Sequence, residues 1–264
     1  MRITMLHSTI HGSGAPLLVF HGLFGSADNW STLGKRWSTH FEVHLVDLRN
    51  HGRSPHFPTH SYSEMAMDAL EYMRAHSLRS AHVLGHSMGG KVAMELACTS
   101  PESVRSLLVA DIGPWAYPVH HAAIIKALQE LNPSQYTQRK EAEMAFARSG
   151  LDAGTRLFLL KNLYWEGETL AWRINLQALA QHIEEVGKPL SAQAHFSGPC
   201  LFLRGAQSSY IPENAEPMLR QWFPHARLET IASAGHWLHA DQPEQVFQAG
   251  LDFFSAVEAG LGGA

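Results

Sequence analysis

The sequence predicts a doubly wound α/β domain built on a mostly parallel sheet. Short, continuously apolar runs recur along the chain, as expected for strands that are buried on both faces of such a sheet. Each run is followed by a glycine-bearing turn and then by helical periodicity, the alternation that βαβ units produce. The runs are "PLLVFHG", "VHLVDLRNHG", "AHVLGHSMGG", "SLLVADIG", "PCLFLRG" and "ARLETIASAGH".

The composition fits one large domain that acts on a small molecule. The chain has 264 residues, of which 45% are hydrophobic and 17% are charged, so it can bury a sizeable core. The net charge is -4 without a long run of one sign, so the basic surface of a nucleic-acid-binding protein is absent. No apolar run approaches the roughly 18 residues of a membrane span, so we expect a cytoplasmic protein without stable membrane insertion. Composition does not predict the oligomeric state.

Helical segments between the apolar runs have recognisable ends. Ser61 and Glu64 have the spacing of a capping box, and an apolar stripe follows them. A second helix in "GGKVAMELACTS" ends before Pro101. The pattern "PEQVFQAGLDFFSAV" predicts a C-terminal helix that docks on the core.

The alternation stops between residues 114 and 196, where the pattern becomes helical. "HHAAIIKALQEL", "RKEAEMAFARSG", "GTRLFLLKNLYW" and "LQALAQHIEEV" predict a helical insertion between two strands. We therefore divide the chain into a core, residues 1–113 and 197–264, and a helical cap, residues 114–196. Such a cap would lie over the carboxyl ends of the strands, where these sheets bind ligands. Its aromatic residues are either core or pocket lining: Trp115, Tyr117, Phe158, Tyr164 and Trp165.

Cysteine and histidine give no sign of a disulfide framework or a metal site. Cys98 and Cys200 lie in apolar settings and are expected to be small buried hydrophobes. The 18 histidines are many, yet no HExxH or Cys/His cluster occurs among them. We expect most of them to be solvated or hydrogen-bonded.

The heptapeptide "LGHSMGG" is the most informative motif. Gly85 to Gly89 fit G-x-S-x-G between an apolar strand and a helix, the context in which a sharp turn presents a nucleophilic serine. Ser87 is therefore the candidate nucleophile, and the glycines remove side chains that would clash in the turn. The N–H of Met88, at the helix start, would face an oxygen that becomes negative during reaction.

Two further loops supply candidate partners for Ser87. "FHGLFG" ends a strand, and the N–H of Leu23 in this turn is the candidate for a second oxyanion donor. "SAGHWLHADQPE" places His236 between the last predicted strand and the last helix, as expected for a general base. His239 is the alternative base, but it lies nearer the helix and lacks a preceding glycine. The order serine then histidine is typical of one of the three common triad arrangements.

The histidine needs a carboxylate to orient it, and the loops can be searched for one. The loop after "LFLRG" reads "AQSSY" and has Ser208 but no carboxylate. Asp111 ends the strand "SLLVAD", and because neighbouring strands lie about 4.8 Å apart, a carboxylate displaced by one strand still reaches the imidazole. We therefore predict that Asp111 is the acid that orients His236. Alternatively, Asp111 is purely structural, and Glu213 or Asp241 is the acid.

These motifs together resemble the α/β-hydrolase superfamily and, within it, the YbfF-like esterases. The resemblance rests on "HGLFGS", "VDLRNHGRS", "GHSMGG", "DIGP" and "AGHW" and covers nearly the whole chain. It implies an eight-strand core with a small helical cap, no metal or organic cofactor, and hydrolysis of esters or acyl-CoA thioesters. It also implies the relocated acid, with Ser208 kept as an accessory hydrogen-bonding group. The substrate pocket would be lined by Phe24, His86, Trp115, Tyr117, Trp165, Tyr210 and Trp237.

Several alternatives stay open at this stage. Asp47 and Arg49 in "VDLRNHGRS" are expected to form a structural pair, whereas Arg49 or Arg53 could instead meet an anionic part of the substrate. A carbon–carbon bond hydrolase of the same fold would use the same three groups. A non-catalytic scaffold that binds a ligand or partner is the alternative from another functional class.

Overall fold

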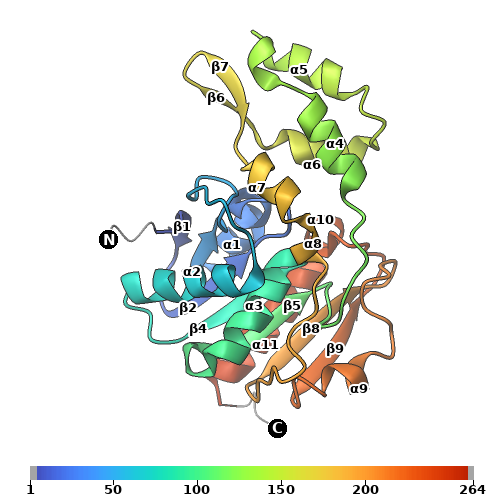
Figure 1. The fold of residues 1–264 in the computed structure, drawn as a ribbon. Helices are drawn as coiled ribbons and strands as arrows, with labels where there is room; N and C mark the ends of the chain where they lie inside the picture. Colours follow the sequence, from blue (N-terminus) through green and yellow to red (C-terminus); the bar gives the residue numbers. More distant parts are fainter. Residues whose placement is uncertain (1–4, 261–264) are drawn as a thin grey trace.

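The computed structural model describes residues 5–260 and contains an α/β core with an inserted segment that projects from one end of it (Figure 1). A seven-stranded sheet runs through the core in the order β1-β3-β2-β4-β5-β8-β9. Strand β1 pairs antiparallel with β3, and the other neighbours pair in parallel. The strands are β1 Ser8–His11, β2 Ala15–Phe20, β3 Phe41–Val46, β4 Ala81–His86, β5 Val104–Ala110, β8 Cys200–Gly205 and β9 Ala226–Ile231.

Helices cover both faces of this sheet, as the continuous apolar runs predict. The residues of β4, β5 and β8 alternate between the two faces and are almost all buried. Helices α2 and α3 belong to one apolar cluster, and α1 and α11 belong to the other. The core helices are α1 Ser31–Trp37, α2 Tyr62–Ala75, α3 Met88–Thr99, α9 Glu216–Leu219, α10 Leu238–Asp241 and α11 Pro243–Glu258, with 3-10 turns η1 Ala27–Trp30 and η2 Pro101–Ser103.

The number of strands differs from the expected eight. Within residues 5–260 the main sheet has seven strands, and the six apolar runs singled out in the sequence form six of them. The seventh is the edge strand β1, which is short and mostly half-buried. An edge strand of this kind lacks the continuous apolar signal that marks the central strands.

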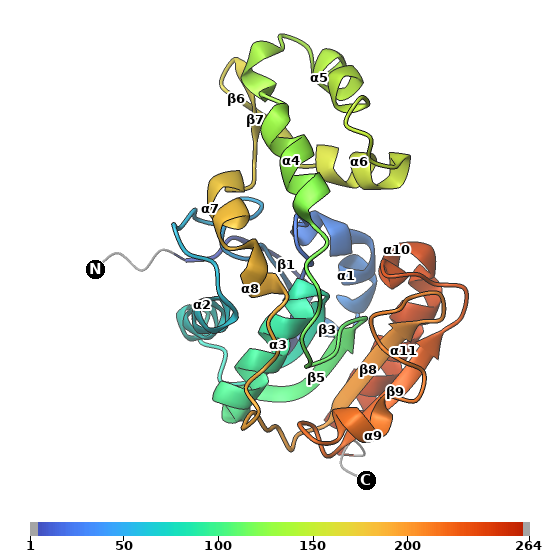
Figure 2. The same ribbon diagram turned by 45° about the vertical axis from the view of Figure 1, so that its right-hand side comes forward.

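The inserted segment contains a hairpin as well as helices, so the expectation of a purely helical cap was wrong. Figures 1 and 2 show α4, α5, α6 and the β6–β7 hairpin projecting beyond the core. Gly167 adopts φ 63° at the turn, a conformation that glycine accepts easily. The elements are α4 Ala122–Glu130, η3 Pro133–Gln135, α5 Arg139–Phe146, α6 Ala153–Leu160, β6 Leu163–Glu166, β7 Thr169–Trp172, α7 Leu176–Gln181 and α8 Ile183–Val186. The cap boundaries at residues 113/114 and 196/197 stay a prediction.

Two other features bear on the expectations from composition. Cys98 and Cys200 are free thiols; Cys200 is buried and Cys98 is half-buried. Across residues 5–260, every helix falls short of the length and apolar character that a membrane crossing requires.

The capping box at the start of α2 provides a test of local stability. Glu64 N–H donates to Ser61 Oγ at 3.4 Å, and Ser61 N–H donates to the Glu64 carboxylate at 3.1 Å. Ser61→Ala should lower the free energy of unfolding by about 1 kcal/mol, because the first turn loses an acceptor. Urea denaturation measures this change. Ser255→Ala, an exposed position inside α11, is the matched control and should leave stability nearly unchanged; equal losses in both variants would contradict a capping effect.

Candidate active site

Ser87 occupies a strained turn between β4 and α3. Its backbone has φ 54° and ψ -120°, a conformation that a residue with a side chain rarely adopts. A Cβ at Gly85 would lie 2.1 Å from the Gly89 carbonyl oxygen, and one at Gly89 would lie 2.5 Å from that of Phe20. Only glycine fits at these two positions, so the motif allows the close approach that exposes the serine hydroxyl at the end of the sheet.

The register between β4 and β5 brings Asp111 next to Ser87. His86 pairs with Ala110 across the two strands, so the residue after each lies at the same edge. The Asp111 side chain is buried and accepts a hydrogen bond from Gly205 N–H at 2.9 Å. Its other oxygen accepts a hydrogen bond from the Ser208 hydroxyl. The end of β8 and the loop after it, which contain no carboxylate, therefore donate hydrogen bonds to the Asp111 carboxylate at the end of β5.

His236 bridges Ser87 and Asp111. Its Nε2 lies 2.9 Å from Ser87 Oγ, and its Nδ1 lies 2.8 Å from Asp111 Oδ2. Because the carboxylate accepts from Nδ1–H, the other ring nitrogen is free to accept the serine proton. The ring of Tyr210 stacks on the imidazole with centroids 4.1 Å apart. The structure thus brings together the three side chains that the sequence singled out from separate loops.

The alternative acids and the alternative base lie elsewhere. Asp241 accepts a hydrogen bond from Gly235 N–H at 2.8 Å and does not cap α11. Glu213 is exposed. The ring of His239 stacks on Trp30, with centroids 4.3 Å apart, rather than facing the nucleophile.

The loop that carries Leu23 lies against the nucleophile. A Cβ at Gly22 would come within 3.3 Å of Ser87 Cβ, so the two turns are packed closely. Leu23 N–H has no hydrogen-bond acceptor among the described residues. Met88 begins α3, where backbone N–H groups have no partner within the helix. Both N–H groups are therefore available to an oxygen beside Ser87.

Two side chains that the sequence analysis missed hold this loop. Phe24 N–H donates to His51 Nε2 at 3.1 Å, and Asn162 Nδ2 donates to the Phe24 carbonyl at 2.7 Å. Burial lowers the pKa of His51 well below its usual value, which favours the neutral ring that can accept a hydrogen bond. The sequence could have pointed to His51, because this residue lies in the "RNHGRS" motif. Asn162 lies in the inserted segment outside any motif, so no sequence signal marked it.

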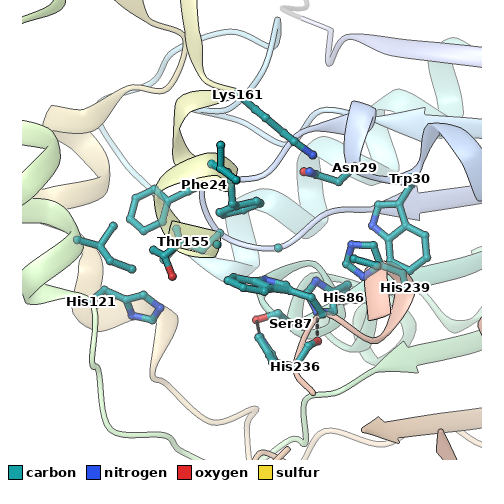
Figure 3. A pocket seen from close by; sticks show the side chains of 18 of the residues that line it. Phe24, Asn29, Trp30, His86, Ser87, His121, Thr155, Lys161, His236 and His239 are labelled. Atoms are coloured by element: carbon teal, nitrogen blue, oxygen red, sulfur yellow. Dashed lines mark hydrogen bonds between the residues drawn. The ribbon is translucent and has the colours of Figure 1, made fainter. Parts of the chain in front are cut away.

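A cavity of about 440 Å³ opens beside Ser87 and His236 (Figure 3). Four of the predicted pocket residues line it, namely Phe24, His86, Tyr210 and Trp237. The lining also includes residues that the sequence analysis did not assign to the pocket: Asn29, Trp30, His121, Thr155, Lys161 and His239. The cavity is thus enclosed by loops of the core and by helices of the inserted segment.

Three predicted pocket residues do not line this cavity. Trp115 packs on Gly113, where a Cβ would lie 2.3 Å from its ring. Tyr117 lines a smaller neighbouring cavity that also touches Ser87, and its hydroxyl donates to the Tyr210 carbonyl at 2.8 Å. Trp165 is 46% exposed because the β6–β7 hairpin carries it away from the core. The sequence marked these residues as aromatic but could not orient them.

The model of the alpha/beta hydrolase family matches residues 17–249. The chain belongs to this family. A mouse protein named sn-1-specific diacylglycerol lipase ABHD11 is 39% identical over 249 residues, which cover 91% of this chain and 81% of the mouse protein. Esterase YbfF of Escherichia coli (strain K12) is 35% identical over 240 residues, which cover 90% of this chain and 92% of that protein.

A solved structure, described as a marine microorganism esterase, shares the architecture. Its TM-score is 0.91 at 39% sequence identity, with 95% of this chain and 99% of that chain covered. The predicted fold class and the resemblance to YbfF-like esterases are confirmed. As an enzyme, this α/β hydrolase falls among the carboxylic ester hydrolases, as the sequence predicted.

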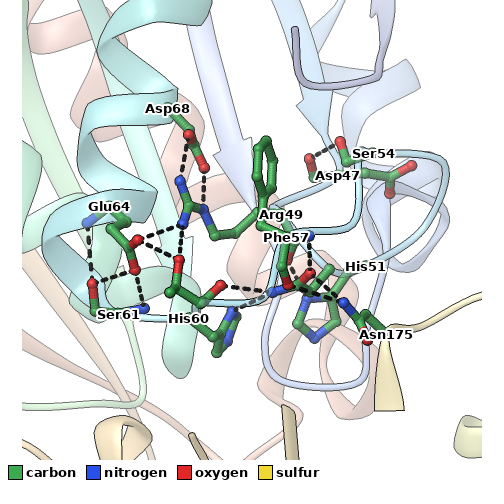
Figure 4. Close-up of polar contacts among 12 residues, drawn as sticks. Asp47, Arg49, His51, Ser54, Phe57, His60, Ser61, Glu64, Asp68 and Asn175 are labelled. Atoms are coloured by element: carbon green, nitrogen blue, oxygen red, sulfur yellow. Dashed lines mark hydrogen bonds and ion pairs between the residues drawn. The ribbon is translucent and has the colours of Figure 1, made fainter. Parts of the chain in front are cut away.

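The "VDLRNHGRS" loop of this hydrolase has a structural ion pair, but with different partners from those expected (Figure 4). Arg49 binds Asp68 at 2.8 Å and Glu64 at 3.1 Å, both on α2. Asp47 instead accepts the backbone N–H groups of Ala27 at 2.7 Å and Arg53 at 2.9 Å. The sequence could not reveal the α2 carboxylates as partners, since they lie outside the motif. Neither arginine lines the cavity beside Ser87, so the structure gives no support to their contact with a substrate anion there.

Lys91, on the helix that follows the nucleophile, joins the two chain segments that connect the core to the inserted elements. Its ammonium donates to the carbonyl oxygens of Trp115 at 2.6 Å and Lys188 at 2.9 Å. The side chain is fully buried and forms no ion pair with a carboxylate within residues 5–260. Burial lowers the pKa of Lys91 to about 7.

This buried lysine predicts a specific dependence of stability on pH. Its folded pKa lies below the unfolded value of about 10.4, so between pH 7 and 10 the unfolded chain binds more protons and stability rises with pH. We expect the wild-type protein to gain on the order of a few kcal/mol over this range relative to Lys91→Met, as measured by urea unfolding. Lys140→Met, an exposed lysine of α5, should retain the wild-type slope. Identical slopes for the wild type and Lys91→Met would rule out the effect.

Proposed function

We propose that the protein hydrolyses carboxylic esters through an acyl-enzyme on Ser87, with His236 as general base and Asp111 as its acidic partner. One observation carries the proposal: His236 lies 2.9 Å from Ser87 Oγ on one side and 2.8 Å from Asp111 Oδ2 on the other. A histidine between a hydroxyl and a buried carboxylate is the arrangement of serine hydrolases on several unrelated folds. The named activities of the relatives agree with ester cleavage.

In the first half-reaction, His236 Nε2 takes the hydroxyl proton while Ser87 Oγ attacks the ester carbonyl carbon. Asp111 keeps the proton of the imidazole on Nδ1 and stabilises its cationic form. The tetrahedral intermediate then collapses, the bond to the alcohol oxygen breaks, and His236 donates its proton to that oxygen. In the second half-reaction water attacks the acyl-enzyme, with His236 again as base.

The N–H groups of Leu23 and Met88 are proposed to bind the oxyanion of both intermediates. Removal of one such donor typically costs about 100-fold in rate, so the pair would supply much of the barrier reduction. The loop of Leu23 is held by His51 and Asn162, which makes these two side chains positioning residues.

The cavity supports a small-molecule substrate. Its volume of about 440 Å³ lies in the range of ligand pockets and suits a substrate of modest size or one end of a longer acyl chain. An acyl-CoA thioester presents the same carbonyl chemistry to Ser87, so we include thioesters in the proposal. Rates across esters and acyl-CoA substrates of increasing chain length would define which of these the enzyme prefers.

Ser87→Ala should abolish hydrolysis of p-nitrophenyl butyrate, because Ser87 is the one nucleophilic side chain among residues 5–260 that is hydrogen-bonded to His236 Nε2. Initial rates from p-nitrophenolate absorbance measure this loss. A fluorophosphonate probe should label the wild-type protein and leave Ser87→Ala unlabelled, since labelling requires an activated serine. Ser255→Ala is the matched control and should behave as the wild type. Activity or labelling that survives in Ser87→Ala would place the chemistry elsewhere.

Replacement of the two side chains near the imidazole separates their roles. Asp111→Asn should lower kcat by about 1,000-fold or more, because the amide neither favours the reactive tautomer nor offsets the imidazolium charge. Ser208→Ala removes one hydrogen bond to the same carboxylate and should cost far less. Glu213→Gln, an exposed carboxylate, should leave kcat unchanged. Comparable losses in the Asp111 and Ser208 variants would refute the assignment of the acid.

A further inference from the structure

We propose that the end of the cavity far from Ser87 binds a carboxylate carried by the substrate, and that Lys161 is the residue that selects for it. Asn29, Trp30 and His239 complete this anion subsite. The inference rests on the proposed ester hydrolysis and adds a substrate class to it, namely esters with a negatively charged group in the acyl or the alcohol part.

Unsatisfied polar atoms gather around the cavity. Four buried side-chain nitrogen or oxygen atoms have no hydrogen-bond partner in the described part of the chain, and three of them belong to residues that line this cavity: Trp30 Nε1, His121 Nδ1 and His239 Nδ1. Buried polar groups in native proteins are almost always paired, so these unpaired atoms stand out; none of the three is exposed to the cavity as the side chains stand, and a ring must turn slightly for its nitrogen to meet a ligand group. Trp30 Nε1 is a donor only and requires an acceptor.

The charges around the cavity have one sign. Lys161 is the one Lys, Arg, Asp or Glu among the lining residues. It follows α6 and has no ion-pair partner among the carboxylates of residues 5–260. A cation at the rim of a largely apolar cavity without any carboxylate attracts an anion and disfavours a second cation.

The neighbours of Lys161 add donors without adding charge. Figure 3 shows the ammonium end of Lys161 directed toward Asn29, across the cavity from Ser87 and His236. The Asn29 carbonyl oxygen already accepts the N–H of Ser26 at 2.7 Å, which leaves its amide NH₂ to donate. Burial, with smaller contributions from His236 and Lys161, lowers the pKa of His239 to about 3, so its ring is neutral at physiological pH.

The balance of charge favours a carboxylate over a phosphate. One lysine offsets one negative charge, and the neutral donors of Asn29, Trp30 and His239 can satisfy the remaining lone pairs of a carboxylate. A phosphate dianion would leave one charge without a counter-ion in a partly enclosed site. The subsite therefore has the charge and the donors for a monoanion.

Matched charged and neutral esters provide the test. The acyl series compares p-nitrophenyl hydrogen adipate with p-nitrophenyl adipamate, in which a carboxamide of equal size replaces the carboxylate. The alcohol series compares 5-acetoxypentanoate with 5-acetoxypentanamide. Rates for Ser87→Ala are subtracted as the uncatalysed background. The readout is the ratio of kcat/KM for the charged and neutral members, which a general folding defect would not move.

In at least one series we expect Lys161→Met to lower kcat/KM for the charged ester by about tenfold and to change the neutral amide by less than about twofold. Lys161→Arg should retain most of the preference, and Lys140→Met, which removes an exposed charge from the same inserted segment, should leave the ratio at the wild-type value. The wild-type ratio should also fall as salt is raised.

An unchanged ratio in Lys161→Met in both series would overturn the anion subsite. This outcome differs from a failure of the proposed function. If the neutral esters are hydrolysed in a Ser87-dependent manner while the ratio stays flat, ester hydrolysis stands and only the subsite is wrong. If Ser87→Ala hydrolyses the neutral esters as fast as the wild type, the proposed function itself fails.

Discussion

The pairing of β4 with β5 is the constraint on which the candidate site depends. Because His86 lies opposite Ala110, the chain leaves the sheet at neighbouring points with Ser87 on one strand and Asp111 on the next. A shift of one residue in this register would turn one of the two side chains toward the opposite face of the sheet. The distances at His236 thus depend on backbone pairing deep in the core, where both strands are buried.

The fold and the centre of the site were accessible from sequence because their signals are local. Continuous apolar runs marked six strands, and Gly85 and Gly89 marked a turn that no larger residue can form. The position of Asp111 required one further inference, namely that a residue at the end of one strand lies about 4.8 Å from the end of the adjacent strand. The identity of the acid could be argued in this way because strand spacing varies little between proteins.

The remaining features depend on contacts between distant segments, and no local sequence pattern indicates them. The hairpin that carries Trp165 outward resembled the end of a helix, and the partners of Arg49 lay on a helix outside its motif. Lys161 is a single charged residue after a short helix, and only the folded chain shows that the cavity contains no carboxylate to neutralise it. Sequence therefore indicated the reacting groups better than the groups that surround a substrate.

The hydrogen bonds of Lys91 have a consequence for how the inserted segment can move. One ammonium holds the carbonyls of Trp115 and Lys188, which lie on the outgoing and the returning chain. If either connecting segment moves away, the buried ammonium loses a hydrogen-bond acceptor. Its hold on the other segment is then weakened, so separation of one segment favours separation of the other. Both connections of the inserted segment are thus tied to one side chain on α3, the helix that begins beside the nucleophile, so their stabilities are coupled.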